Sequence, residues 1–267
     1  MSECDLTSPL LSSGLCRPQL CRLNNGSFGA SPCVVLEEQR RLQAEWQRNP
    51  DDFWLSLHSR FSSTQEALAT GLFQGRVRAQ DLAVVDNLTV AMSIVVHSVI
   101  ANITAPRSVI VLSSLTYNAV KNAVDYGIEQ ARARARGQSV VDISVLTVDI
   151  PFPLVAADPE KALVALYRDA LATLPPDTNI ALACLDHIAS LPCLRFPVRE
   201  IVQVLREAGA KEVLVDGAHG PGQLDVAEEV PLMGADYYVA NLHKVCCKSF
   251  IFSLIMTQLK YRNHICT

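Results

Sequence analysis

The chain has 267 residues, of which 49% are hydrophobic and 19% are charged. This composition supplies a sizeable hydrophobic core and excludes a disordered chain. The formal net charge of −4 comes without a basic block, which argues against a nucleic-acid-binding surface. The nine cysteines are odd in number and include no pair with two residues between them, which favours reduced thiols over a disulfide framework or a metal site.

Residues 1–21 form a polar leader that lacks the basic start and apolar core of a signal peptide. A helical segment is predicted over residues 31–70, where Ser31 is a candidate N-cap and Pro32 falls at the first helical position. A second helix follows Asn49-Pro50. The apolar faces of the two helices are expected to carry Val35, Leu42 and Trp46, and then Phe53, Trp54, Leu57 and Phe61.

From residue 82 onward, apolar strands alternate with helices. Because the strands are continuously apolar, the sheet that they form must be covered on both faces, which is typical of a mostly parallel α/β domain. No stretch reaches the roughly 18 consecutive apolar residues that a membrane helix requires. The strands are expected at 82–85, 108–113, 143–148, 180–185, 212–216 and 236–240, and the helices at 89–101, 117–134, 159–174 and 198–209.

Polar and ionisable residues follow almost every predicted strand. In an open α/β sheet, ligands bind just beyond the carboxyl ends of the strands. Each residue alone has a simpler explanation, such as a turn aspartate, a structural histidine, a helix cap or a surface lysine, but their convergence on one edge favours a binding site. These residues are Asp86, Asn87, Thr89, Thr116, Tyr117, Asp186, His187, Ser190, Asp216, His219, Asn241, His243 and Lys244.

This combination of side chains suits pyridoxal phosphate. The cofactor needs a lysine to form a Schiff base, a carboxylate at its pyridinium nitrogen, a group against the ring, a partner for the phenolic oxygen and amides for the phosphate. In that order of role, the chain offers Lys244, Asp216, Tyr117, His219 or His187, and Asn87 to Thr89.

The motifs "LNNGSFGASP", "VVDNLTVA", "LDHIASLPCLRFPVREIV", "VDGAHGPGQLDV" and "GADYYVANLHK" occur in this order over residues 22–244. Together they resemble class V aminotransferases, within them the isopenicillin-N-epimerase-like branch that includes plant-type L-cysteine desulfhydrases. The resemblance implies pyridoxal phosphate as cofactor and an aspartate-aminotransferase-like, fold type I large domain over residues 22–244.

The resemblance also implies roles for individual residues. Lys244 would hold the cofactor, and Asp216 would pair with its ring nitrogen. His219 and His187 would lie near the phenolic oxygen, and Tyr117 would cover the ring. The remaining implied contacts are Asn87 and Thr89 in the phosphate-binding turn, His243 at the phosphate or ring, and the loop Asn24 to Gly29 at the mouth of the site.

The resemblance stops after Lys244. Residues 245–267 are therefore expected to be an off-family tail, the large domain to be incomplete, and the C-terminal small domain of the family to be absent. The run "FIFSLIM" within this tail has a simpler interpretation as an ordinary buried strand, which would be aggregation-prone without sheet neighbours.

The resemblance implies a lyase that breaks L-cysteine down to hydrogen sulfide, ammonia and pyruvate. It also implies a homodimer, and the absence of targeting signals favours the cytoplasm over the nucleus or an organelle. Transamination or epimerisation of another amino acid remains an alternative, as does an inactive truncated isoform or misread gene product. Whether this chain is an active enzyme stays open at this point.

Overall fold

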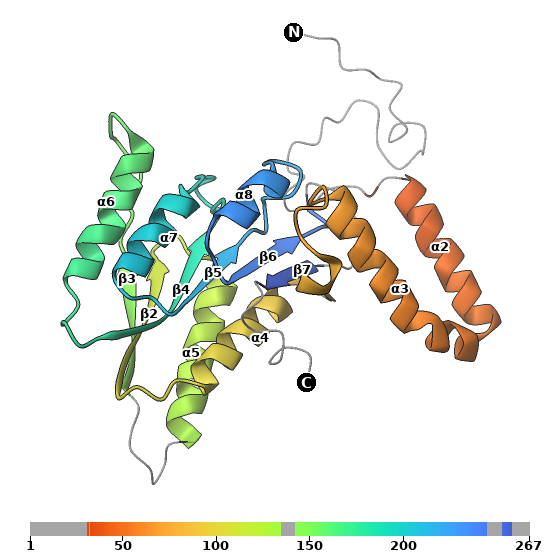
Figure 1. The fold of residues 1–267 in the computed structure, drawn as a ribbon, viewed down its shortest axis with the longest axis horizontal. Helices are drawn as coiled ribbons and strands as arrows, with labels where there is room; N and C mark the ends of the chain where they lie inside the picture. Colours follow the sequence, from red (N-terminus) through yellow and green to blue (C-terminus); the bar gives the residue numbers. More distant parts are fainter. Residues whose placement is uncertain (1–30, 32, 135–141, 245–252, 258–267) are drawn as a thin grey trace.

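The structure, a computed structural model, describes residues 31, 33–134, 142–244 and 253–257. Its centre is a seven-stranded sheet with the order β1-β7-β6-β5-β4-β2-β3 (Figure 1). The pairings among β2 to β6 are parallel, and β7 runs antiparallel to both of its neighbours. The strands are β1 (Leu82–Val85), β2 (Arg107–Ser113), β3 (Asp142–Val148), β4 (Asn179–Asp186), β5 (Glu212–Asp216), β6 (Tyr237–Asn241) and β7 (Ser253–Thr257).

Helices cover both faces of this sheet, as the continuously apolar strands predict. In Figure 1, α4 and α5 lie on one side of the sheet and α6, α7 and α8 on the other, and a separate hydrophobic core fills the space under each group. None of the described helices is both long and apolar enough to cross a membrane. The helices are α4 (Leu88–Ala101), α5 (Asn118–Arg134), α6 (Pro159–Ala172), α7 (Val198–Glu207) and α8 (Val226–Leu232).

The predicted elements from residue 82 onward are confirmed with small shifts at their ends. Gly209 has a φ of +87°, which only glycine adopts without strain, and it follows α7 where the sequence predicts a C-cap. Two short elements escaped prediction: a 3-10 turn at Ala79–Asp81, and α8. Helix α8 is seven residues long and contains Pro231, so it is too short for helical periodicity to show.

Strand β7 changes the interpretation of the segment that follows Lys244. It lies between β1 and β6 and pairs with both. The described part of the β-prone run is therefore an ordinary strand, as its simpler interpretation predicts, and the condition for an aggregation hazard does not apply to it, because its backbone pairs with two neighbouring strands. The sheet continues past the boundary expected at Lys244, while residues 245–252 and 258–267 lie outside the described residues.

Two helices precede the sheet, α2 (Cys33–Arg48) and α3 (Pro50–Gly71), as predicted. The Asn49 side chain caps α3 by accepting a hydrogen bond from the backbone N–H of Asp52. Only Ala69, near the end of α3, is buried. The expected apolar faces are only partly covered, because both helices extend away from the sheet (Figure 1): Val35, Leu42, Phe53 and Leu57 are half-buried, whereas the exposed fractions are 51% for Trp46, 72% for Trp54 and 44% for Phe61. The leader, Pro32 and the loop 24–29 lie outside the described residues.

Candidate functional site

A cavity of about 200 Å³ opens at the carboxyl ends of β4, β5 and β6, where α4 and α5 begin. This is the edge at which parallel α/β sheets bind ligands. The structure brings together seven of the eight site residues that the sequence predicts. They are Asn87, Thr89, Tyr117, Asp216, His219, His243 and Lys244.

Lys244 and His219 form the centre of the cavity. The Nζ atom of Lys244 lies 3.0 Å from Nε2 of His219, and Nδ1 of His219 lies 3.3 Å from the carbonyl oxygen of Ile188. A carbonyl oxygen only accepts, so Nδ1 carries the proton and Nε2 accepts from the lysine. Burial lowers the pKa of Lys244, against the opposing charge of Asp216, and burial followed by the nearby Lys244 charge lowers the pKa of His219. The pair thus holds a lysine that loses its proton more readily than an exposed one.

Asp216 supplies the carboxylate of the cavity. It is the last residue of β5, is 6% exposed, and accepts a hydrogen bond at Oδ1 from the backbone N–H of Ala218 at 2.9 Å. Burial raises the pKa of Asp216 to about 6, while the Ala218 hydrogen bond and the charge of Lys244 limit the rise. Asp216 is therefore mostly ionised at neutral pH and can pair with a cationic ring nitrogen.

The first turn of α4 places several backbone N–H donors at the wall of the cavity. Oδ1 of Asn87 accepts from the N–H of Val90 at 2.9 Å, and the carbonyl of Asn87 accepts from Ala91. The N–H groups of Leu88 and Thr89 have no acceptor within the helix, as in the first turn of any α-helix. Together with the positive end of the helix dipole, they suit a phosphate group.

Tyr117 and His243 also line the cavity that holds Lys244. Tyr117 is 52% exposed and immediately precedes α5, so its ring stands at the mouth of the cavity. His243 is half-buried and adjoins Lys244 in sequence. Both positions agree with contacts to a ring or phosphate, and their individual roles stay predictions.

His187 is the exception, because it does not line the cavity and its two ring nitrogens face other partners. Its Nδ1 lies 3.1 Å from Oη of Tyr238 and its Nε2 lies 3.1 Å from Oε2 of Glu229, on α8. Successive residues of an extended strand point to opposite faces of the sheet. The preceding residue, Asp186, points into the cavity, so His187 points into the layer beneath α8 and is a buried structural histidine.

Asp186, Ser190 and Asn241 also line the cavity, although sequence reasoning gave them no role. A signal for Asp186 was present: β4 and β5 both end in aspartate, and Asp186 pairs in register with Asp216. Two aspartates at equivalent ends of neighbouring strands of a buried parallel sheet must face the same cavity.

The turn that carries Asp216 and His219 packs directly on Tyr238. A Cβ atom on Gly217 would lie 2.1 Å from Cζ of Tyr238, and one on Gly220 would lie 2.2 Å from its Oη. Tyr238 is 1% exposed, and its hydroxyl bonds His187, so the ring has little freedom to move. The absence of a side chain at these two glycines thus fixes the height of the turn above the sheet.

We expect Gly217→Ala to destabilise the fold by about 1–3 kcal/mol, the usual cost of forcing extra carbon into a packed core. Thermal unfolding followed by circular dichroism measures this as a lower midpoint. Gly71→Ala is the matched control, because a Cβ there meets nothing within 4 Å. Equal melting midpoints for the two variants would show that Tyr238 does not constrain the turn.

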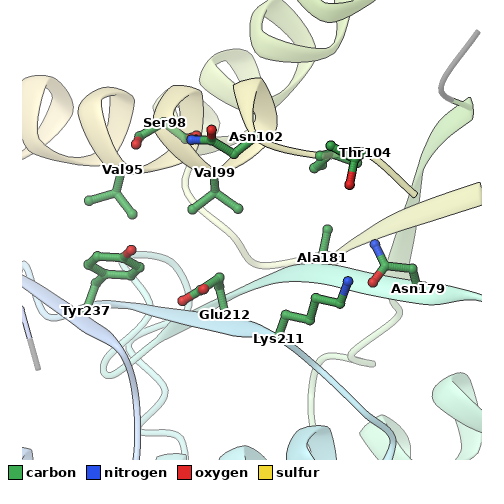
Figure 2. A pocket seen from close by; sticks show the side chains of 11 residues that line it. Val95, Ser98, Val99, Asn102, Thr104, Asn179, Ala181, Lys211, Glu212 and Tyr237 are labelled. Atoms are coloured by element: carbon green, nitrogen blue, oxygen red, sulfur yellow. The ribbon is translucent and has the colours of Figure 1, made fainter. Parts of the chain in front are cut away.

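A larger cavity of about 300 Å³ lies at the opposite, amino ends of the same strands (Figure 2). Val95 and Val99 of α4 face Tyr237 across it, and Lys211 and Glu212 lie side by side on its strand side (Figure 2). Its lining contains no histidine among the described residues. The smaller cavity is the better candidate, because lysine, histidine, carboxylates and a helix N-terminus converge there.

No protein-family model matches the sequence. The chain is 33% identical over 239 residues to L-cysteine desulfhydrase of Arabidopsis thaliana, a match that covers 84% of this chain and 47% of that protein. It is 27% identical over 228 residues to isopenicillin N epimerase of Streptomyces clavuligerus, covering 85% of this chain and 50% of the epimerase. The chain therefore spans about half the length of these curated relatives.

Among solved structures, the chain resembles a mutant of C-DES with glycine covalently linked to its PLP cofactor. The TM-score is 0.69 at 20% identity, and the match covers 88% of this chain and 56% of C-DES. This likeness establishes the fold: a parallel sheet between helices, of the type I class found in enzymes that use pyridoxal phosphate, over about half of that structure. The chain is thus a homologue of the L-cysteine desulfhydrases and isopenicillin N epimerase over about half of their length, in agreement with the resemblance of its motifs.

Proposed function

We propose that the cavity around Lys244 binds pyridoxal phosphate and that the chain provides this site for the desulfhydration of L-cysteine. The observation that carries the proposal is the 3.0 Å contact between Lys244 and His219, in one cavity with Asp216. The similarity to L-cysteine desulfhydrase supports the choice of reaction. The chain spans about half of that relative, so the catalysis of the complete reaction by this chain is itself part of what we propose.

The side chains present fit the cofactor group by group. The amine of Lys244 suits the aldehyde carbon, the carboxylate of Asp216 suits the ring nitrogen, and the first amides of α4 suit the phosphate. Oδ2 of Asp186 is buried without a hydrogen-bond partner among the described residues, so the cavity holds a polar atom that a ligand can satisfy. A purely structural cavity would not collect these four features at one strand edge.

Pyridoxal phosphate, when bound, supplies an electron sink that lowers the cost of removing a proton from the α-carbon of an amino acid. Lys244 would carry that proton at Nζ, and its lowered pKa suits a group that must accept and return a proton near neutral pH. His219 holds Nζ in place through Nε2. Asp216 would bind and orient the ring through its ionised carboxylate. The overall change converts L-cysteine and water to hydrogen sulfide, ammonia and pyruvate.

The experiment loads the purified chain with pyridoxal phosphate, adds L-cysteine, and measures sulfide and pyruvate together. Equal amounts of both products, absent with Lys244→Ala, support desulfhydration. Binding of the cofactor without either product would restrict the proposal to cofactor binding. Loss of L-cysteine chirality without sulfide would favour epimerisation, the reaction named for the Streptomyces relative.

We also propose that the protein is a homodimer, with the outer face of α2 and α3 as part of the contact. Trp54 and Phe61 are seven residues apart on α3 and therefore lie on one side of the helix. Both are exposed, together with Trp46 of α2. Aromatic side chains are enriched in the buried centres of protein interfaces and are costly to leave in water.

The double substitution Trp54→Ala with Phe61→Ala is expected to weaken self-association by at least about tenfold, because aromatic anchors typically contribute 2 kcal/mol or more to an interface. Sedimentation equilibrium measures the dissociation constant. Glu66→Ala, an exposed position elsewhere on α3, serves as the control and should leave it unchanged. A wild-type chain that stays monomeric at all concentrations would contradict the homodimer.

A further inference from the structure

We propose that Asp186 stays protonated in the folded protein, so that Asp186 and Asp216 share a single negative charge and Asp186 donates a hydrogen bond into the cavity. The pairing is a property of the fold. The ligand that accepts the bond rests on the proposed function, and the two parts are tested separately below.

The sheet forces the two carboxyl groups together. Asp186 of β4 and Asp216 of β5 are direct partners across a parallel pair, and neighbouring strands lie about 4.8 Å apart. Both side chains line the same cavity and are nearly inaccessible, at 3% and 6% exposed. Two carboxylates this close in a poorly solvated site resist ionising together, since each negative charge raises the cost of the other.

The nearby cations do not neutralise Asp186. Nζ of Lys121, on α5, donates to the carbonyl oxygen of Ser114 at 2.8 Å, and Lys244 bonds His219. Oδ2 of Asp186 has no hydrogen-bond partner among the described residues. The other polar or titratable groups that act on Asp186 are the hydroxyls of Thr116 and of Tyr167 on α6, and the thiol of Cys184 on β4.

The surroundings decide which of the two aspartates keeps the proton. Burial, and then the charge of Asp216, raise the pKa of Asp186 to about 8, although Lys121 and a hydrogen bond from Thr116 oppose this. The pKa of Asp216 rises only to about 6, because the Ala218 N–H and Lys244 stabilise its ionised form. At pH 7 the proton therefore resides on Asp186 and the charge on Asp216.

With the proton on Asp186 and the negative charge on Asp216, the two carboxyl groups can make different contacts with a ligand. The ionised Asp216 is free to pair with a cationic nitrogen, as the proposed function requires. A protonated carboxyl is a hydrogen-bond donor, whereas an ionised one only accepts. The partnerless Oδ2 of Asp186 can thus donate to an electron-rich oxygen of a bound ligand. Above the pKa of Asp186 this donor becomes a second negative charge beside Asp216.

The first test needs no ligand and compares Asp186→Asn with the wild type between pH 5 and 8.5. A carboxyl whose pKa is raised on folding stabilises the fold at low pH and loses that effect as pH rises through its folded pKa. The wild type should therefore lose stability, relative to the variant, by up to about tenfold in the unfolding constant per pH unit until about pH 8. Urea unfolding at each pH measures the ratio.

Asp125→Asn, at an exposed position of α5, is the control and should follow the wild type at every pH. Parallel profiles for Asp186→Asn and the wild type would overturn the proposal. If Asp186→Asn does not fold, infrared spectra of the wild type decide instead. A protonated-carboxyl band at pH 7 that disappears as pH rises past about 8 is expected, and its absence at pH 7 refutes a protonated Asp186.

The second test measures the dissociation constant of pyridoxal phosphate at pH 7 and pH 9. Asp186→Asn carries an amide donor at both pH values, so its dissociation constant should change less between pH 7 and pH 9 than that of the wild type. At pH 9 the wild type should bind more weakly than the variant. Equal pH dependence of the two proteins would contradict a donor role for Asp186. Failure of the wild type to bind at all would instead refute the proposed function, and the ligand-free test would still decide whether Asp186 is protonated.

Discussion

Replacing Lys244 with alanine is expected to abolish covalent attachment of pyridoxal phosphate to the chain. Lys244 is the only lysine that lines the cavity among the described residues, and its hydrogen bond to His219 fixes the position of its amine. Its pKa is lowered by burial, so a larger fraction of the amine is unprotonated and nucleophilic than at an exposed lysine. Borohydride reduction followed by mass spectrometry measures the label, which should fall from about one per chain to none.

Lys211→Ala is the matched control for this experiment. Lys211 lies in the other cavity, at the amino end of β5, and is likewise a lysine beside a strand of the same sheet (Figure 2). Its replacement should leave the label in place. A label that survives Lys244→Ala, or that disappears with Lys211→Ala, would move the site away from the carboxyl edge of the sheet.

Replacing Asp216 with asparagine should weaken the binding of pyridoxal phosphate by roughly 10- to 150-fold, the equivalent of losing a hydrogen bond to a charged group worth about 1.5–3 kcal/mol. Of the two carboxyl groups among the described residues that line the cavity, Asp216 is the one ionised at pH 7, so it suits a cationic ring nitrogen. Equilibrium dialysis at pH 7 measures the dissociation constant. Asp177→Asn, in an exposed turn, is the control.

The same substitution should also remove the weakening of pyridoxal phosphate binding at acid pH. The pKa of Asp216 is raised to about 6, so the carboxylate is ionised above this pH and becomes neutral as pH falls through it. Binding by the wild type should therefore weaken between about pH 7 and 5. Asp216→Asn should bind weakly but evenly across this range. If binding by Asp216→Asn still weakened between about pH 7 and 5, the pH dependence would come from a group other than Asp216.

The buried sheet was predictable because each strand is a short, continuous apolar run. "EVLVD" shows why the site could also be predicted: four residues fix the strand, and the first polar residue after them must lie at the carboxyl edge. The same rule led to both Asp186 and His187, and it could not choose between them. Which one faces the cavity depends on where β4 ends, and a shift of one residue reverses the faces.

The features that the sequence did not predict depend on contacts between segments that are distant in the chain. Strand β7 joins the sheet through backbone pairing with β1 and β6, which leaves no periodic mark in its sequence. The apolar residues of α2 and α3 recur at helical spacing, as the sequence indicates. That periodicity shows which side is apolar but not whether anything covers it, and Trp54 remains exposed in the described structure.

The most direct measurement is the visible absorption spectrum of the purified 267-residue chain during titration with pyridoxal phosphate, followed by borohydride reduction and peptide mapping of the same sample. The proposed site predicts a saturable visible band with about one cofactor per chain, and a single reduced label on Lys244. No band, or a label spread over many lysines, would contradict a cofactor site in this chain.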